Sequence, residues 1–281
     1  MRTIAYLGPV HTNTHLAARA KFGSRSRYLH APTIEEVFHL VERRQADYGV
    51  VPVENSLAGA VAHTLDRFID FVDTPVRIHG EIEQPIRHCL IVHPNVRISE
   101  LRVIYSHPQA FTQCHRWLTT HLPQAQRWET NSTAEAVVYV MNKAMGPSGY
   151  ALRQRGAIGT RELANEHHLR AISIPEEREN RTRFLVLGLG APRRGARNKT
   201  SVLFALKDAP GALHDALVPF KHNHINLTKI ESRPSRRKAW EYLFFIDLEG
   251  HETAPQVKRA LATLKVHTSL FRVLGSYPSA T

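Results

Sequence analysis

The sequence predicts an α/β fold in two parts, a two-lobed first part and a smaller second part. Strand-like and helix-like segments alternate through residues 1–190, which is typical of a parallel or mixed sheet. Residues 191–199 contain Pro, Gly and four basic side chains without an apolar period, as expected for a linker. Residues 200–281 then follow the order strand, helix, strand, strand, helix, strand. We therefore expect domains at 1–190 and 200–281.

Local patterns justify the elements of the first domain. Tyr48–Val53 is a continuous apolar run, as in a strand that is buried on both faces. Thr33 with Glu36, and Ser132 with Glu135, have the spacing of a capping box at a helix start. The expected strands are 3–7, 48–53, 76–83, 88–92, 103–105 and 184–189. The expected helices are 14–22, 34–41, 61–69, 109–118 and 133–141. The extended stretch 76–92 predicts a crossover between two lobes, with a ligand cleft between them.

The second domain reads as the ferredoxin-like βαββαβ pattern. Its expected strands are 201–206, 226–233, 239–248 and 268–275, and its expected helices are 212–222 and 254–264. An open sheet of this size often pairs with a second copy of itself. We therefore expect a homodimer or a homotetramer.

The basic charge of the chain is spread rather than concentrated. The net charge is +12, and residues 1–190 hold 22 basic against 18 acidic side chains. Outside residues 191–199 the sequence contains no basic stripe with interleaved aromatics, which a nucleic-acid binder would usually carry. This favours a surface that attracts anionic metabolites and argues against a nucleic-acid partner.

The chain has the composition of a cytoplasmic protein. Its longest apolar runs fall far short of the roughly 20 residues of a membrane span, so we expect no membrane partner. The N-terminus lacks the extended apolar region of a signal peptide. The two cysteines, Cys89 and Cys114, give no disulfide framework, which favours a reducing compartment.

Standard catalytic motifs are missing from the sequence. It contains no glycine-rich phosphate loop, no Gly-x-Ser-x-Gly and no His-Glu-x-x-His. Its 18 histidines do not have the spacing of metal ligands. We therefore expect no metal site.

Several short polar segments lie where strands are expected to end. In open α/β sheets, ligands bind at the carboxyl ends of strands. Hydroxyl and amide groups there suit a polar organic anion. The segments are Val51-Pro-Val-Glu-Asn-Ser56, Ser106-His-Pro-Gln-Ala-Phe-Thr-Gln113, Asn131-Ser-Thr133 and Asn180-Arg-Thr-Arg-Phe184. Taken singly, each also fits ordinary capping or turn chemistry.

Together and in this order, these segments resemble the prephenate dehydratase family over nearly the whole chain. The second domain is similar to that family's regulatory ACT domain, through Gly211-Ala-Leu213, Ile225-Asn-Leu-Thr-Lys-Ile-Glu-Ser-Arg-Pro234 and Leu274-Gly-Ser-Tyr-Pro278. The resemblance implies two lobes similar to periplasmic binding proteins, with the site in the cleft. It implies conversion of prephenate to phenylpyruvate, water and carbon dioxide in L-phenylalanine biosynthesis, without a cofactor.

The resemblance also implies roles for individual residues. Thr182 is the expected central catalytic residue, which would donate a hydrogen bond to the departing hydroxyl. Asn55, Ser106 and Gln113 would orient the substrate. The remaining expected substrate-binding residues are Glu54, Ser56, Thr12, Thr14, Ser132, Thr133, Arg183 and Phe184. Arg183 would bind a carboxylate or, alternatively, form a structural ion pair. Phe184 suits packing or a wall against the substrate ring, and Glu54 suits a contact that closes the lobes.

The first loop departs from the family's usual Gly-Pro-x-Gly-Thr pattern. It reads Gly8-Pro-Val-His-Thr-Asn-Thr14, so that His11 replaces a glycine and Asn13 an aromatic residue. If the position needs a positive φ, histidine costs about 1 kcal/mol there or moves the loop.

The second domain has features of an amino-acid effector site. Asp208-Ala-Pro-Gly211 leads into a helix, and exposed amides at a helix start bind carboxylates. The expected effector residues are Gly211, Ala212, Leu213, Glu231 and Ser232. The resemblance implies feedback inhibition by L-phenylalanine at a dimer interface; the alternative is a domain that only dimerises.

Three other functions remain compatible with the sequence. Arogenate dehydratase differs only in an ammonium group on the substrate, and a non-aromatising prephenate decarboxylase shares the fold. Retention of Thr182 and of the whole second domain argues against the decarboxylase. A non-catalytic amino-acid sensor is the third alternative.

Overall fold

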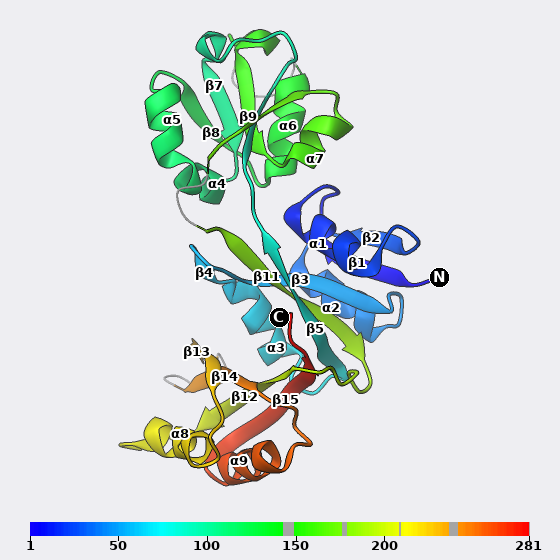
Figure 1. The fold of residues 1–281 in the computed structure, drawn as a ribbon, viewed down its shortest axis with the longest axis vertical. Coiled ribbons are helices and arrows are strands. Elements are labelled where there is room, and N and C mark those ends of the chain that lie inside the picture. Colours follow the sequence, from blue (N-terminus) through cyan, green and yellow to red (C-terminus); the bar gives the residue numbers. More distant parts are fainter. Residues whose placement is uncertain (143–148, 176–178, 208, 236–240, 281) are drawn as a thin grey trace.

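Three bodies make up the molecule (Figure 1). The computed structural model describes residues 1–142, 149–175, 179–207, 209–235 and 241–280. Lobe 1, in the middle, contains the N-terminus; lobe 2 lies at one end and the C-terminal βαββαβ domain at the other. In the described part of the chain, no helix has the length and apolarity that crossing a membrane requires.

Lobe 1 is built on a mixed sheet with the strand order β2-β1-β3-β11-β5. Its strands are β1 (Thr3–Leu7), β2 (Arg27–Ala31), β3 (Tyr48–Asn55), β5 (Val76–Pro85) and β11 (Arg181–Leu189), with the short β4 (Gly59–Ala60) paired to β3. The first three run parallel, whereas β11 is antiparallel to both β3 and β5. The late strand β11 therefore lies between two early ones.

Three helices cover this sheet, and their starts follow the sequence. They are α1 (Asn13–Phe22), α2 (Ile34–Glu42) and α3 (Ala62–Asp70). Thr33 caps α2 as predicted, with its side chain accepting from the Glu36 amide at 3.1 Å. The apolar face of α2 packs into the core with Phe38, which is fully buried against Phe68 of α3.

Lobe 2 is a second mixed sheet, of order β10-β6-β9-β7-β8. Its strands are β6 (Cys89–Val92), β7 (Val103–Ser106), β8 (Gln126–Glu129), β9 (Arg155–Gly159) and β10 (Arg170–Ser173). Its helices are α4 (Pro108–Gln113), α5 (His115–His121), α6 (Thr133–Met141) and α7 (Arg161–Glu166), with short 3-10 turns at Ile98–Glu100 and Leu152–Gln154. Cys89 and Cys114 are both free and buried, Cys89 in one of its two apolar clusters and Cys114 in the other.

Two passages connect the lobes. The chain leaves lobe 1 through β5 and enters lobe 2 at β6, as the extended stretch 76–92 predicted. It returns from β10 into β11. The two ends of lobe 2 lie side by side, because Cys89 of β6 pairs with Ser173 of β10. Lobe 2 is thus an insertion into lobe 1.

The C-terminal domain has the predicted βαββαβ order. Its elements are β12 (Asn198–Leu206), α8 (Ala212–His222), β13 (Leu227–Pro234), β14 (Tyr242–Glu249), α9 (Pro255–Val266) and β15 (Thr268–Pro278). They form an antiparallel sheet of order β13-β14-β12-β15. One face packs on α8 and α9, with Phe204 and Phe220 fully buried between them.

The other face of this sheet packs on lobe 1. Leu203, Phe245 and Leu274 share one apolar cluster with Phe68 and Ile78 of lobe 1. Gly275 of β15 approaches β5 so closely that a Cβ there would overlap the Ile78 carbonyl oxygen. The Arg272 guanidinium donates to carbonyl oxygens after α3, including those of Phe71 and Val72. The C-terminal domain is therefore docked on the back of the lobe 1 sheet.

Several elements differ from the sequence prediction. The helix expected at 109–118 breaks at Cys114 into α4 and α5. The strands β2, β8, β9 and β10 and the helix α7 were not predicted. β12 begins at Asn198, inside the segment expected as a linker, and β11 begins at Arg181 rather than at residue 184. The earlier start of β11 places Thr182 and Arg183 within a strand.

Candidate active site

A pocket of about 270 Å³ lies between the two lobes. Seven of the twelve residues that we expected at the catalytic site line it, from both sides: Thr12, Thr14, Asn55, Gln113, Ser132, Thr133 and Thr182. Its other lining residues are Leu7, Gly8, Asn13, Ile86, His88, His107, Gln109, Ala110 and Asn131. A second cavity of about 450 Å³ shares His88, Gln109 and Gln113 with it and continues the cleft.

Thr182 and Asn55 form a pair on adjacent strands of this pocket. They are register partners on β11 and β3. The Asn55 Nδ2 donates to Thr182 Oγ1 at 2.9 Å. Because Thr182 Oγ1 accepts this bond, its own hydroxyl proton is available to a group in the pocket.

The orientation of the Asn55 amide is fixed by the backbone. Its Oδ1 accepts from the amides of Leu57 and Ala58, at 3.1 and 3.0 Å. The Nδ2 group must therefore face the Thr182 side. Asn55 itself is 5% exposed, so that the pair is held in a well-packed place.

The network continues through three more side chains across the cleft. Asn55 Nδ2 also donates to Asn180 Oδ1 at 2.8 Å, and Asn180 Nδ2 donates to Gln113 Oε1 at 3.0 Å. His88 Nε2 lies 2.7 Å from the same Gln113 oxygen. Because this oxygen can only accept, His88 carries a proton on Nε2. This network thereby joins lobe 1 to lobe 2 beside the Asn55–Thr182 pair.

Two helix starts lie at one side of the pocket. Thr12 caps α1 and Ser132 caps α6, each through a side-chain oxygen that accepts an amide of the first turn. The next residues, Asn13, Thr14 and Thr133, line the pocket. The exposed first amides of a helix and its dipole favour a carboxylate. The described lining residues include no Lys or Arg.

Comparison with protein families decides the family of this chain. The family model for prephenate dehydratase matches residues 4–191, and the model for the ACT domain matches residues 200–266. The chain belongs to the prephenate dehydratase family.

Curated relatives agree with this assignment over the whole length. The chain is 44% identical to a bifunctional chorismate mutase/prephenate dehydratase of Aquifex aeolicus, over 99% of this chain and 74% of the relative. It is 33% identical to the prephenate dehydratase of Bacillus subtilis, over 98% of both. The family assignment therefore covers both domains.

Solved structures share the arrangement of all three bodies. A prephenate dehydratase of Arthrobacter aurescens in complex with L-Phe superposes with a TM-score of 0.88 at 31% identity, covering 99% of this chain and 90% of that one. A structure described as a novel type of quorum-quenching acylase superposes with a TM-score of 0.83 at 28% identity, covering 99% and 98%.

The structure separates three expected residues of the prephenate dehydratase site from the pocket. Ser106 is fully buried, and its hydroxyl donates to the Ile158 carbonyl at 3.0 Å, so it ties β7 to β9. Phe184 is 1% exposed in the lobe 1 core, where it cannot form a wall against a ligand. Ser56 bonds the backbone at Glu179 and Arg181 and does not line the pocket.

Arg183 and Glu54 face away from the pocket, which corrects the roles expected of them in substrate binding and lobe closure. The Arg183 guanidinium lies 2.8 Å from Glu54, 3.2 Å from Glu81 and 2.7 Å from Asp247. All three carboxylates belong to the protein. Arg183 therefore forms structural ion pairs, which was the alternative role expected for it. Side chains alternate along a strand, and Thr182 takes the pocket side.

The altered first loop keeps the conformation that glycine favours. His11 has a φ of 64°, in the left-handed region. Its amide donates to His15 Nδ1 at 3.0 Å, and its ring lies 3.5 Å from Glu166 of lobe 2. Burial, followed by His11 and Arg19, lowers the pKa of His15 to about 4. His15 is therefore neutral near pH 7 and stacks on Tyr6.

Sequence reasoning missed His88, His107 and Asn180 as parts of this site. Asn180 lies in a polar segment that the sequence did single out, two residues before Thr182. His107 follows Ser106 in another such segment and caps α4 through its ring nitrogen. His88 lies in the crossover between the lobes, and its position there was the available signal.

The expected effector residues lie on two elements of the C-terminal domain, the start of α8 and the strand β13. Gly211 caps α8 with a φ of 80°, which favours glycine, and Ala212 and Leu213 open the helix. Glu231 is half-buried and Ser232 exposed on the edge strand β13. Asp208 lies outside the described residues. Among the described residues, no group of His, Cys, Asp or Glu is arranged to hold a metal ion.

Proposed function

We propose that this protein is a prephenate dehydratase that forms phenylpyruvate and is inhibited by L-phenylalanine. The observation that carries the proposal is the Asn55–Thr182 pair in the cleft. The Asn55 amide donates a hydrogen bond to the Thr182 oxygen, so the Thr182 hydroxyl proton is free to bond the substrate. The named prephenate dehydratases that match both domains support it.

The chemistry needs little more than correct placement. The bond between the ring and its carboxylate breaks, and its electron pair moves through the ring to expel the hydroxyl group at the opposite carbon. Carbon dioxide leaves, the hydroxyl takes up one proton to become water, and the ring becomes aromatic. Thr182 donates a hydrogen bond to the departing oxygen, which is worth roughly 3 kcal/mol in the transition state. The proton that is consumed comes from solvent.

The neutral lining of the pocket suits this reaction. The starts of α1 and α6 hold the substrate carboxylates through backbone amides and through Thr14 and Thr133. A fixed arginine beside the ring carboxylate would stabilise its ionised form, whose electron pair has to move into the ring as neutral carbon dioxide leaves. Amides and dipoles hold that group more weakly, which favours decarboxylation.

L-Phenylalanine is proposed to bind the C-terminal domain at Gly211, Ala212, Leu213, Glu231 and Ser232. The relative of known structure that contains L-Phe supports this effector. β13 is an edge strand, so a second copy of the chain would complete the site and make a homodimer or homotetramer. We place the enzyme in the cytoplasm, where the biosynthesis of phenylalanine would use it.

The decisive experiment measures phenylpyruvate formed from prephenate, with and without L-phenylalanine. Thr182→Val keeps the size of the side chain but removes the hydroxyl, and we expect kcat to fall about 100- to 1000-fold. Thr182→Ser keeps the hydroxyl and should retain most of the activity. Wild-type protein that is folded but forms no phenylpyruvate would overturn the proposal. Turnover of arogenate in preference to prephenate would reassign the substrate.

A further inference from the structure

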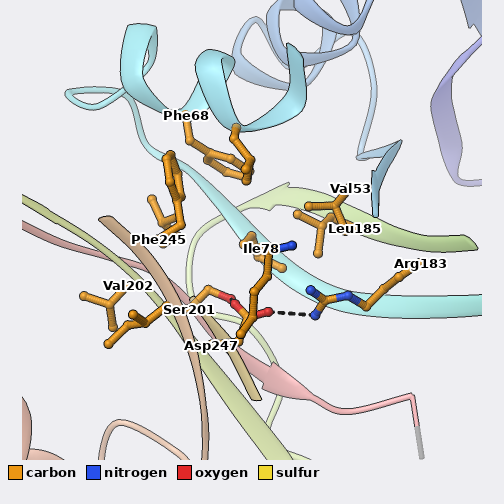
Figure 2. Close-up of a pocket in the computed structure, with 13 residues that line it drawn as sticks. Val53, Phe68, Ile78, Arg183, Leu185, Ser201, Val202, Phe245 and Asp247 are labelled. Atoms are coloured by element: carbon orange, nitrogen blue, oxygen red, sulfur yellow. Dashed lines mark hydrogen bonds and ion pairs between the residues drawn. The ribbon is translucent and has the colours of Figure 1, made fainter. Parts of the chain in front are cut away.

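A cluster of six charged side chains lies directly behind the catalytic pair. Thr182–Asn55 and Arg183–Glu54 are successive partner pairs on β11 and β3. Successive side chains on a strand point to opposite faces, so one pair faces the cleft and the other faces the C-terminal domain. Figure 2 shows Arg183 reaching Asp247 of β14.

The two domains contribute equally to this interdomain charge cluster. Arg183, Glu54 and Glu81 come from lobe 1, and Lys199, Lys229 and Asp247 come from the C-terminal domain. Besides the three contacts of Arg183, Lys229 lies 3.1 Å from Glu54, and Lys199 lies 2.8 Å from Glu81. Ser201 donates to the other Asp247 oxygen at 2.5 Å.

Neither domain balances its own share of the charge. Lobe 1 contributes two carboxylates and one guanidinium, whereas the C-terminal domain contributes two ammonium groups and one carboxylate. The side chains of Glu81, Lys229 and Asp247 are 0%, 8% and 10% exposed. Charges this well buried must be paired, so each domain depends on the other for neutrality.

The pKa values agree with strong pairing. Burial opposes the charged form of Arg183, but the Asp247 carboxylate, followed by Tyr277 and Glu81, outweighs it and raises the pKa of Arg183. Burial likewise disfavours ionised Glu54, and Lys229 and Arg183 overcome this to lower the pKa of Glu54.

The same cluster is connected to the expected effector strand. Lys229 lies on β13 opposite Asp247 of β14, two residues before Glu231 and three before Ser232. A displacement of β13 at its effector residues would therefore move Lys229 and, through the strand pairing, Asp247. Lys229 contacts Glu54, and Asp247 contacts Arg183. Glu54 and Arg183 are adjacent in sequence to Asn55 and Thr182, respectively.

We propose that Asp247 and Lys229 are positioning residues for catalysis, which hold the Asn55–Thr182 pair in place through Arg183 and Glu54. Binding of an amino acid to the C-terminal domain then lowers turnover by shifting these two contacts. This inference rests on the proposed function. It requires only that the effector bind two arrangements of the interface unequally.

The test compares Asp247→Asn with Asp66→Asn in the full-length chain. Both substitutions neutralise a buried carboxylate that pairs across the same domain interface, since Asp66 on α3 bonds Arg233 of β13 at 3.1 Å. Of the two, only Asp247 contacts Arg183, the neighbour of Thr182 on β11. We expect Asp247→Asn to lower kcat about 10-fold with little change in the KM for prephenate, because a small misplacement of a catalytic group is costly. Asp66→Asn should leave kcat unchanged.

Inhibition provides the second readout. The ratio of kcat without and with saturating L-phenylalanine should fall toward one in Asp247→Asn, while calorimetry still detects L-phenylalanine binding. Lys229→Gln should likewise lower kcat and weaken inhibition, and it replaces Asp247→Asn in the test if that variant does not fold. An unchanged kcat in folded Asp247→Asn, or an equal loss in Asp66→Asn, would overturn the inference. Inactivity of the wild type toward prephenate would instead refute the proposed function.

Discussion

Asn55 and Thr182 are joined by a hydrogen bond whose direction is set outside the pair. Because Leu57 and Ala58 amides hold Asn55 Oδ1, only the Nδ2 group can face Thr182. Asn55→Asp keeps the shape and both backbone contacts but replaces this donor by an acceptor. The Thr182 hydroxyl would then donate to the carboxylate, away from the substrate. We expect kcat to fall at least 100-fold.

The measurement for Asn55→Asp is the rate of phenylpyruvate formation, together with circular dichroism to establish the fold. The variant should keep the wild-type spectrum. Asn55→Asp that turns over prephenate at the wild-type rate would contradict the direction of the hydrogen bond.

Asn180 extends the same network toward lobe 2. Asn180→Ala removes the acceptor for Asn55 and the donor to Gln113 but leaves the Thr182 hydroxyl in place. We therefore expect a smaller loss of kcat, about 10-fold, since the pair is less rigidly oriented. Ser56→Ala is the matched control, because Ser56 bonds the same segment outside the pocket. Equal kcat values for the two variants would argue against a role for Asn180.

His15 should make the protein less stable in mild acid. Its pKa in the fold is about 4 against 6.5 ordinarily, so between these pH values the unfolded chain binds the proton and the folded chain does not. The free energy of unfolding then decreases as the pH falls through this range, by at most about 1.4 kcal/mol per pH unit.

Denaturant unfolding at several pH values tests this effect. His15→Gln should flatten the decline between pH 6.5 and about 4, whereas His63→Gln, at an exposed site on α3, should leave it as in the wild type. An unchanged slope in His15→Gln would show that other groups cause the acid sensitivity.

Gly275 should be essential for docking the C-terminal domain. A methyl group there would overlap the Ile78 carbonyl of β5, so Gly275→Ala must push the domains apart. We expect a loss of about 1–3 kcal/mol, detected as a lower Tm and as weaker inhibition by L-phenylalanine. Gly80→Ala on β5 is the control, because its Cβ would meet the Val186 side chain at an ordinary 4.0 Å. Equal Tm values for both variants would contradict this account of the interface.

The sequence predicted the elements whose pattern is local. The capping residues Thr33 and Ser132 and the apolar run Tyr48–Val53 all gave correct elements, and the βαββαβ order is confirmed. β8 was missed because all four of its residues are exposed, so it has no apolar alternation. The helical period continues on both sides of Cys114, so a periodicity argument cannot detect the break between α4 and α5 there.

The site was predictable where a segment supplied both the chemistry and the strand end. Asn55 ends β3 and Thr182 lies at the start of the antiparallel β11, so both lie at the same edge of the sheet and line the pocket. The role of Arg183 was not predictable, because its partners Glu81 and Asp247 lie far away in sequence and one of them belongs to the other domain. By residue type alone, a guanidinium directly after Thr182 suits a substrate carboxylate equally well. Only the alternation along β11 separates the two roles.

The insertion of lobe 2 reverses the order in which the two lobes can be completed during synthesis. β3 and β5 of lobe 1 do not pair with each other, and the strand that joins them, β11, is made only after lobe 2. Lobe 2 has all its strands by residue 173 and its two ends already paired. On the ribosome, the segment that is translated second would thus fold first, and the N-terminal sheet would be completed only after β11 has been made.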